Sequence, residues 1–166
     1  ETTTKTSYDQ SNSVTYGQQQ ISDFSGNATY DAARANWGST WRMPTKAEME
    51  ELRYNCTWTW TTQSGVNGYR VTGTNGNSIF LPAAGWCQRT SRYDVGEWGD
   101  YWSSTPNESD AFDGAYKLHL NSGYHIVNWD IRSYGHTVRP AIQNIPQCVC
   151  ERSLQRAYGS PRFKLK

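Results

Sequence analysis

The feature that most constrains this chain is a shortage of aliphatic side chains beside an excess of aromatic ones. Its 166 residues include 8 Trp, 11 Tyr and 4 Phe, and these rings outnumber Leu, Ile and Val taken together. Disordered chains are poor in aromatic residues, so this composition favours a folded protein. Because so few aliphatic residues are present, the core must include rings, each of which buries about 150–250 Å². The remaining rings are then available for a surface.

The length predicts one main domain with appendages. Residues 1–20, rich in Thr, Ser and Gln, are predicted to be a spacer or an edge strand, residues 21–142 the folded domain, and residues 143–166 a basic C-terminal extension. The net charge of the whole chain is only +1, which provides no field to attract nucleic acid. No run of about 20 apolar residues is present, so we expect no transmembrane segment.

Two short helices are expected in the first third of the chain. Residues 27–37 show helical spacing of apolar side chains, with Asn27 or Thr29 as the N-cap and Gly38 after the end. A second helix is predicted after Pro44, because Thr45 and Glu48 have the spacing of a capping box. Helices followed by strands predict an α+β fold.

Alternation of β-branched and aromatic residues, interrupted by turn signals, predicts antiparallel strands in the rest of the chain. They are expected over residues 57–61, 69–71, 78–81, 101–104, 115–120, 124–129 and 137–142. Apart from the strand at 101–104, residues 85–114 show little periodicity and are predicted to form long loops.

Four cysteines, Cys56, Cys87, Cys148 and Cys150, allow three pairings if all are bridged. Their spacing is not that of a zinc site, and it leaves the redox compartment open. The abundance of Ser, Thr and Asn favours an extracellular protein.

Catalytic motifs are sparse. His119 and His125 are expected to face each other across the turn at 121–123 as exposed strand histidines, and no nucleophile elbow or phosphate loop is present. The sequence therefore predicts a protein that is not an enzyme. Calcium is a weaker alternative, and a solvated acidic loop is favoured, so no cofactor is predicted. The candidate calcium ligands are Asp94, Glu97, Asp100, Asn107, Glu108, Asp110 and Asp113.

Four segments together resemble a known family. They are WRMPTKAE at 41–48, SIFLPAAG at 78–85, YWSST at 101–105 and VRP at 138–140. In this order and spacing they resemble the Fibrobacter succinogenes major paralogous domain, found in secreted and surface proteins of Bacteroidetes. The resemblance implies a C-type-lectin-like domain with two short helices and a small antiparallel sheet carrying long loops.

The same resemblance implies that residues 85–140 are a target of a diversity-generating retroelement, which alters surface residues on a fixed scaffold. Two features depart from the family pattern. Cys87 stands where a polar or basic residue is expected, and the chain continues beyond Pro140.

Aromatic and short polar residues are interleaved in residues 86–136, a mixture typical of paratopes. Trp86, Trp102 and Tyr116 are predicted to lie in the core, whereas the rings of Trp98, Trp129, Tyr93, Tyr124 and Tyr134 are predicted to be exposed. The candidate ligand-binding residues are Arg89, Arg92, Tyr93, Asp94, Glu97, Trp98, Asp100, Asn107, Asp110, Phe112, Asp113, Tyr124, His125, Asn128, Trp129, Asp130, Arg132, Ser133, Tyr134 and His136.

The sequence thus predicts a domain that binds a protein or glycan receptor on another cell or host surface and is displayed outside the cell, on its surface or on a virion. It could also form oligomers. A phage tail-fibre tip is one alternative and a subunit or tip of a surface filament is another. An enzyme of the formylglycine-generating kind, using Cys148 and Cys150, is disfavoured because those cysteines lie outside the matched segments.

Overall fold

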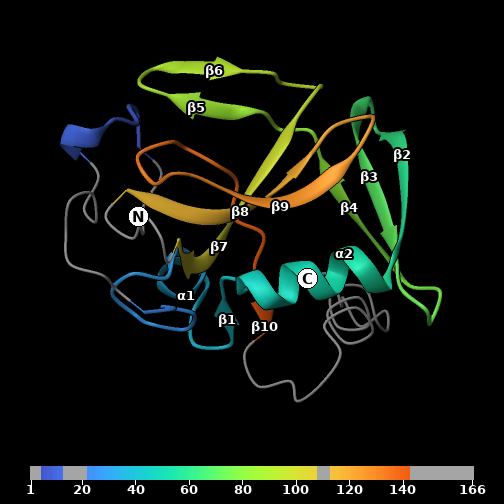
Figure 1. Ribbon diagram of the computed structural model, residues 1–166, viewed down its shortest axis with the longest axis horizontal. Coiled ribbons are helices and arrows are strands. Elements are labelled where there is room, and N and C mark those ends of the chain that lie inside the picture. Colours follow the sequence, from blue (N-terminus) through green and yellow to red (C-terminus); the bar gives the residue numbers. More distant parts are fainter. Residues whose placement is uncertain (1–4, 13–21, 108–112, 143–166) are drawn as a thin grey trace, which may run out of the picture.

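The computed structural model describes residues 5–12, 22–107 and 113–142 (Figure 1). It has the predicted mixture of two short helices and antiparallel strands. The helices are α1 (Ala32–Trp37) and α2 (Lys46–Asn55), and a 3-10 turn, η1, spans Gln10–Asn12. The strands are β1 (Trp41–Arg42), β2 (Thr57–Gln63), β3 (Val66–Thr72), β4 (Ser78–Pro82), β5 (Trp86–Gln88), β6 (Ser91–Tyr93), β7 (Gly99–Pro106), β8 (Gly114–Leu120), β9 (His125–Ile131) and β10 (Ala141–Ile142).

The strands form four small antiparallel sheets in the described residues. Two have three strands, in the orders β2-β3-β4 and β7-β8-β9, and two are the pairs β5-β6 and β1-β10. Figure 1 shows the β7-β8-β9 sheet in the middle of the molecule, with α2 on one side and the β5-β6 hairpin on the other. The C-type-lectin-like identity of this arrangement stays a prediction.

The first helix begins later than the sequence predicts, because Asp31 and not Asn27 or Thr29 is its N-cap. The Asp31 carboxylate accepts hydrogen bonds from three backbone N–H groups, of Arg34 at 3.0 Å, Gly26 at 2.7 Å and Met43 at 2.8 Å. Asn27 instead caps the preceding turn through the N–H of Thr29 at 2.8 Å. A fully buried carboxylate that satisfies three donors outcompetes the local alternatives.

The second helix and its capping box are confirmed. The Thr45 side chain accepts from the N–H of Glu48, and the Glu48 carboxylate accepts in return from the N–H of Thr45 at 2.9 Å. The apolar side of α2 packs on the core through Met49. That core contains Met49, Tyr69, Val71, Ile79, Leu81, Tyr101, Leu118 and Leu120, with Leu52, Cys56, Trp58, Trp60 and Val127 packed against it.

The expectation of long loops over residues 85–114 is wrong in part. This stretch contains the β5-β6 hairpin and a β7 longer than predicted. Conversely, the strand predicted at 137–142 is only the two residues of β10, which pair with β1. Thr137 forms a single bridge with Tyr101, and Gly135 one with Cys87, so this segment is held by isolated contacts that give no periodic signal.

The β7-β8-β9 sheet has two chemically different faces, because side chains alternate along each strand. Tyr101, Leu118 and Leu120 point to the core beneath α2. Asp100 is aligned with His119, and Lys117 with Asn128, on the opposite face. That polar face lies toward the β5-β6 hairpin and positions the site described next.

The cysteines are now partly assigned. Cys56 is disulfide-bonded, whereas Cys87 is a free thiol. The pairing of Cys56 with Cys87 is therefore excluded, and Cys148 and Cys150 lie outside the described residues.

Candidate functional site

A cavity of about 1000 Å³ lies beside the β5-β6 hairpin. Its other walls come from the N-terminal segment 5–8, the region of α1 and the segment 132–138. Tyr8 closes one wall by exchanging backbone hydrogen bonds with Arg89, at 2.9 and 2.6 Å. Gly135 permits the close approach of these walls, since a Cβ there would lie 2.9 Å from ring carbons of Tyr8 and from the Cβ of Cys87.

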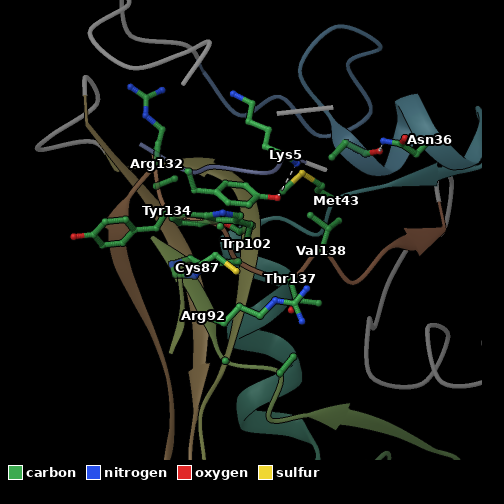
Figure 2. Close-up of a pocket in the computed structure, with 18 of the residues that line it drawn as sticks. Lys5, Asn36, Met43, Cys87, Arg92, Trp102, Arg132, Tyr134, Thr137 and Val138 are labelled. Carbon is green, nitrogen blue, oxygen red and sulfur yellow. Dashed lines mark hydrogen bonds between the residues drawn. The ribbon is translucent and has the colours of Figure 1, made fainter. Parts of the chain in front are cut away.

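The chemical character of the cavity comes from cations, rings and hydroxyl groups. Lys5, Arg89, Arg92 and Arg132 line it, and no Asp or Glu of the described residues does. In Figure 2, Cys87 and Trp102 lie between Arg92 on one side and Lys5 and Arg132 on the other. The rings are Tyr8, Phe24, Tyr30, Trp37, Trp102, Tyr134 and His136, and the hydroxyl side chains are Thr6, Thr90, Ser91, Ser103 and Thr137.

A cluster of rings supports the hairpin side of the cavity. Trp86 stacks on Tyr93 with centroids 4.7 Å apart and lies 5.1 Å from the ring of Tyr134. The indole N–H of Trp86 donates to the Asp94 carboxylate at 2.7 Å. These contacts fix the Tyr134 ring in the wall, because ring pairs at such distances are attractive beyond their buried area.

A network of buried charges lies next to the cavity on the polar face of the β7-β8-β9 sheet. The Lys117 ammonium is 2.8 Å from the carboxylate of Asp100 and 2.6 Å from that of Asp130. His119 Nδ1 lies 2.8 Å from Asp100, and His136 Nε2 lies 3.2 Å from Asp130. His136 also packs on Trp102 at 4.3 Å, so the network reaches the cavity through these two rings.

The electrostatics of His136 and Asp130 determine which nitrogen of the histidine carries the proton. Burial lowers the pKa of His136, so the ring is neutral at pH 7. Burial alone would raise the pKa of Asp130, but hydrogen bonds from His136 and Lys117 outweigh it and hold this pKa at about 2. Because an ionised carboxylate only accepts, we assign the proton to Nε2 of His136. Nδ1 is then an acceptor, buried and without a hydrogen-bond partner in the described residues.

The structure separates the predicted binding residues by exposure. Those on the surface are Arg89, Arg92, Tyr93, Glu97, Trp98, Tyr124 and Trp129, and those of intermediate exposure are Asp94, Asp113, His125, Asn128, Asp130 and Tyr134. The expectation of exposure is wrong for the residues Asp100, Asn107, Arg132 and Ser133 and for the side chain of His136, all of which are buried. Asp110 and Phe112, like Glu108, lie outside the described residues.

The buried members are buried for identifiable reasons. Asp100 is 1% exposed because it is the partner of Lys117 and His119 beneath the hairpin. The backbone of Arg132 is held in place by a hydrogen bond from its N–H to the carbonyl of Asp113 at 2.7 Å. Positions that look arbitrary in sequence, such as His136, therefore have fixed structural partners.

The predicted aromatic face is not one surface. Trp98 and Tyr124 contact His119 from two sides, at 5.1 and 5.5 Å, on the polar face of the sheet. Trp129 pairs with Tyr116 on the opposite face, toward α2. The three rings predicted to lie in the core, those of Trp86, Trp102 and Tyr116, are each only partly buried.

The expectation for the histidine pair is also wrong. His119 is aligned with Ile126 and His125 with Leu120, so the two rings point to opposite faces of the β8-β9 hairpin. His119 is buried against Asp100, and His125 stacks on Trp58 at 4.2 Å. Neither ring is an exposed strand histidine.

Several residues of the site were not predicted from the sequence. Lys5 and Tyr8 belong to the segment expected as spacer or edge strand, and nothing local shows that it pairs with Arg89. Lys117 lies in a predicted strand, where a charged residue between apolar neighbours usually faces water. Trp102 follows Tyr101 in β7, so its side chain points to the opposite face of the strand, where it lines the cavity.

The described residues contain no group of three or more His, Cys, Asp or Glu side chains placed to hold a metal ion. Two of the candidate calcium ligands have other partners: Asp94 accepts from Trp86, and Asp100 is paired with Lys117. In residues 5–12, 22–107 and 113–142, no helix has the length and apolar character needed to cross a membrane.

Fold and site together define a small α+β domain with a cation-lined and ring-lined cavity at one side of its central sheet. Residues 55–141, which include most of the strands and most of the residues that line the cavity, match a family described as a domain of unknown function, DUF8237. The chain belongs to this family. A comparison with curated proteins and one with solved structures found no match.

Proposed function

We propose that this protein is a non-enzymatic binding domain that takes part of its ligand into the cavity beside the β5-β6 hairpin. The cavity carries this proposal. Its volume of about 1000 Å³ lies at the upper end of the range of ligand sites, and its lining combines rings with a few convergent polar groups. Rigid rings beside adaptable hydroxyls are the mixture that binding surfaces use.

An enzyme with a cysteine nucleophile is the competing possibility, because Cys87, His136 and Asp130 lie near one another. Its geometry is unfavourable. No hydrogen bond joins Cys87 to His136, although a nucleophile and its base need one. Cys87 forms an isolated backbone bridge with Gly135. A Cβ added at Gly135 would lie 2.9 Å from the Cβ of Cys87, so a side chain at position 135 would point toward Cys87. Because successive side chains alternate in extended chain, His136 points the other way.

Display outside the cell, with a receptor on another surface as the partner, follows from the family resemblance and remains part of the proposal. Several of the candidate positions are buried, so the proposed diversification by a retroelement is limited to the exposed ones. Substitutions at the exposed Tyr124, Trp98 or Trp129 would leave the ion pairs of the network in place, whereas those at Asp130 or His136 would break them.

A substitution that fills the cavity tests the proposal. Thr90 is exposed in the turn of the β5-β6 hairpin and lines the cavity, so Thr90→Trp places a large ring there without disturbing the core. Thr59→Trp, at an exposed position of β2 away from the cavity, is the matched control. Binding is measured by saturation-transfer NMR against a panel of neutral and acidic oligosaccharides and short peptides.

We expect at least one probe to bind the unmodified protein and the Thr59→Trp variant, and to lose binding to Thr90→Trp by roughly tenfold or more, which corresponds to about 1.4 kcal/mol. Equal binding to both variants, or no binding by any probe, would overturn the proposal.

A further inference from the structure

The charge of the cavity wall identifies the kind of ligand. Lys5, Arg89, Arg92 and Arg132 contribute cations, and no carboxylate of the described residues lines the cavity. The carboxylate nearest in the network, Asp130, is neutralised by Lys117 behind the ring of His136. The field inside the cavity is therefore positive.

Two of these cations have guanidinium groups available to a ligand. Arg92 lies on β6, is exposed, and its side chain has no ion pair in the described part of the chain. Arg89 lies in the adjacent turn with φ of 51°, and its backbone is held by Tyr8, so the turn that carries it is fixed. A guanidinium fork matches the paired oxygens of a carboxylate or sulfate, and such charge-assisted bonds are the strong ones.

The rest of the lining favours a hydroxylated ring compound over a small inorganic anion. The cavity is far larger than one carboxylate, and the rings of Trp102, Tyr134 and Tyr8 provide flat apolar surfaces. Hydroxyl side chains, among them Ser91 and Thr137, can exchange hydrogen bonds with ligand hydroxyls.

Resting on the proposed function, we infer that the ligand is an acidic saccharide whose carboxylate or sulfate is held by Arg92 and Arg89, with its sugar rings against the aromatic wall. Selectivity for acidic over neutral saccharides is the property that follows. It requires no metal ion, since the charge is supplied by side chains.

The experiment compares four probes of similar length on the full chain by isothermal titration calorimetry. They are a hexuronate oligosaccharide, a sulfated oligosaccharide, a neutral oligosaccharide and a single-stranded oligonucleotide. The test variant is Arg92→Gln, and the matched control is Arg70→Gln, since Arg70 is an exposed arginine of β3 away from the cavity. Thr90→Trp is included to report on the cavity itself.

We expect the carboxylated or the sulfated oligosaccharide to bind at least tenfold more tightly than the neutral one, and Arg92→Gln to remove most of this difference. Which of the two acidic probes binds identifies the anionic group. Affinity should also fall as salt rises, and Arg70→Gln should change nothing.

Equal affinity for acidic and neutral saccharides that Thr90→Trp abolishes would refute the charge selectivity and leave the binding function intact. Equal or tighter binding of the oligonucleotide would show general attraction of polyanions and overturn the saccharide inference. Acidic binding that Thr90→Trp leaves unchanged would place the ligand outside the cavity and overturn both proposals.

Discussion

The ammonium of Lys117 lies 2.8 Å from the buried carboxylate of Asp100 and 2.6 Å from the partly buried carboxylate of Asp130, which makes Lys117→Met an informative perturbation. The side chain of Asp100 is 1% exposed, so its charge has almost no water to replace the lost partner. Removing one member of a buried ion pair typically costs about 3–5 kcal/mol. Lys46→Met is the control, since Lys46 lies over the Tyr116 ring at 3.7 Å and such a contact contributes about 0.5–1 kcal/mol.

Urea unfolding followed by tryptophan fluorescence at pH 7 measures both variants. With a slope of about 2 kcal/mol per molar urea, Lys117→Met should lower the midpoint by roughly 2 M, and Lys46→Met by less than about 0.5 M. If Lys117→Met does not fold, the double variant Lys117→Met with Asp130→Asn removes one of the uncompensated charges and should recover part of the loss.

Acid dependence provides a second readout of the same network. The pKa of Asp130 is about 2 in the folded protein and about 3.9 in the unfolded chain. Its contribution of about 2.6 kcal/mol is therefore complete above about pH 5 and is lost as the pH falls toward 2. Lys117→Met should shrink this acid-dependent loss. A cost below 1 kcal/mol together with unchanged acid dependence would refute the reasoning.

Two further predictions concern the groups around the cavity. Burial lowers the pKa of His136, so its contribution to stability is complete above the unfolded pKa of about 6.5 and is lost as the pH falls below it. His136→Gln keeps a hydrogen-bond donor for Asp130 and should lessen the loss of stability between pH 7.5 and 5, measured by thermal unfolding. An unchanged pH profile would contradict this. Cys87 is a free thiol that lines the same cavity, so iodoacetamide should modify it more slowly in the Thr90→Trp variant than in Thr59→Trp. The rate is followed by peptide mass spectrometry, and equal rates would show that Thr90→Trp does not fill the cavity.

Local signals in the sequence predicted much of the fold because they act over a few residues. The capping box of Thr45 and Glu48 depends on spacing that can be read directly. The N-cap of α1 could not be chosen in this way. Asp31 is the N-cap because its fully buried carboxylate also accepts a hydrogen bond from the N–H of Met43, which is twelve residues away in the chain.

The candidate site was predicted less well, because its walls come from segments far apart in the chain. Arg89, Arg92 and Tyr134 were identified by their residue types, but the N-terminal wall of Lys5 and Tyr8 was not. Alternation also hid the burial of Asp100. A charged residue at the start of a strand ordinarily faces water, whereas the carboxylate of Asp100 is paired with Lys117 and His119 and is 1% exposed.

The shortage of aliphatic residues explains why a charge network lies beneath the cavity at all. The aliphatic side chains of Leu118 and Leu120 are used on the face toward α2, where the apolar core is built. The opposite face of the same strand must pack with polar and charged side chains, and Lys117 and His119 are paired there with carboxylates. Apolar side chains in a core can be exchanged if volume is kept, whereas this layer depends on matched charges at hydrogen-bond distance. Substitutions at the exposed rings and at Arg89 and Arg92 should therefore leave the fold stable and change only binding, whereas substitutions at Lys117 and its partners should destabilise the fold.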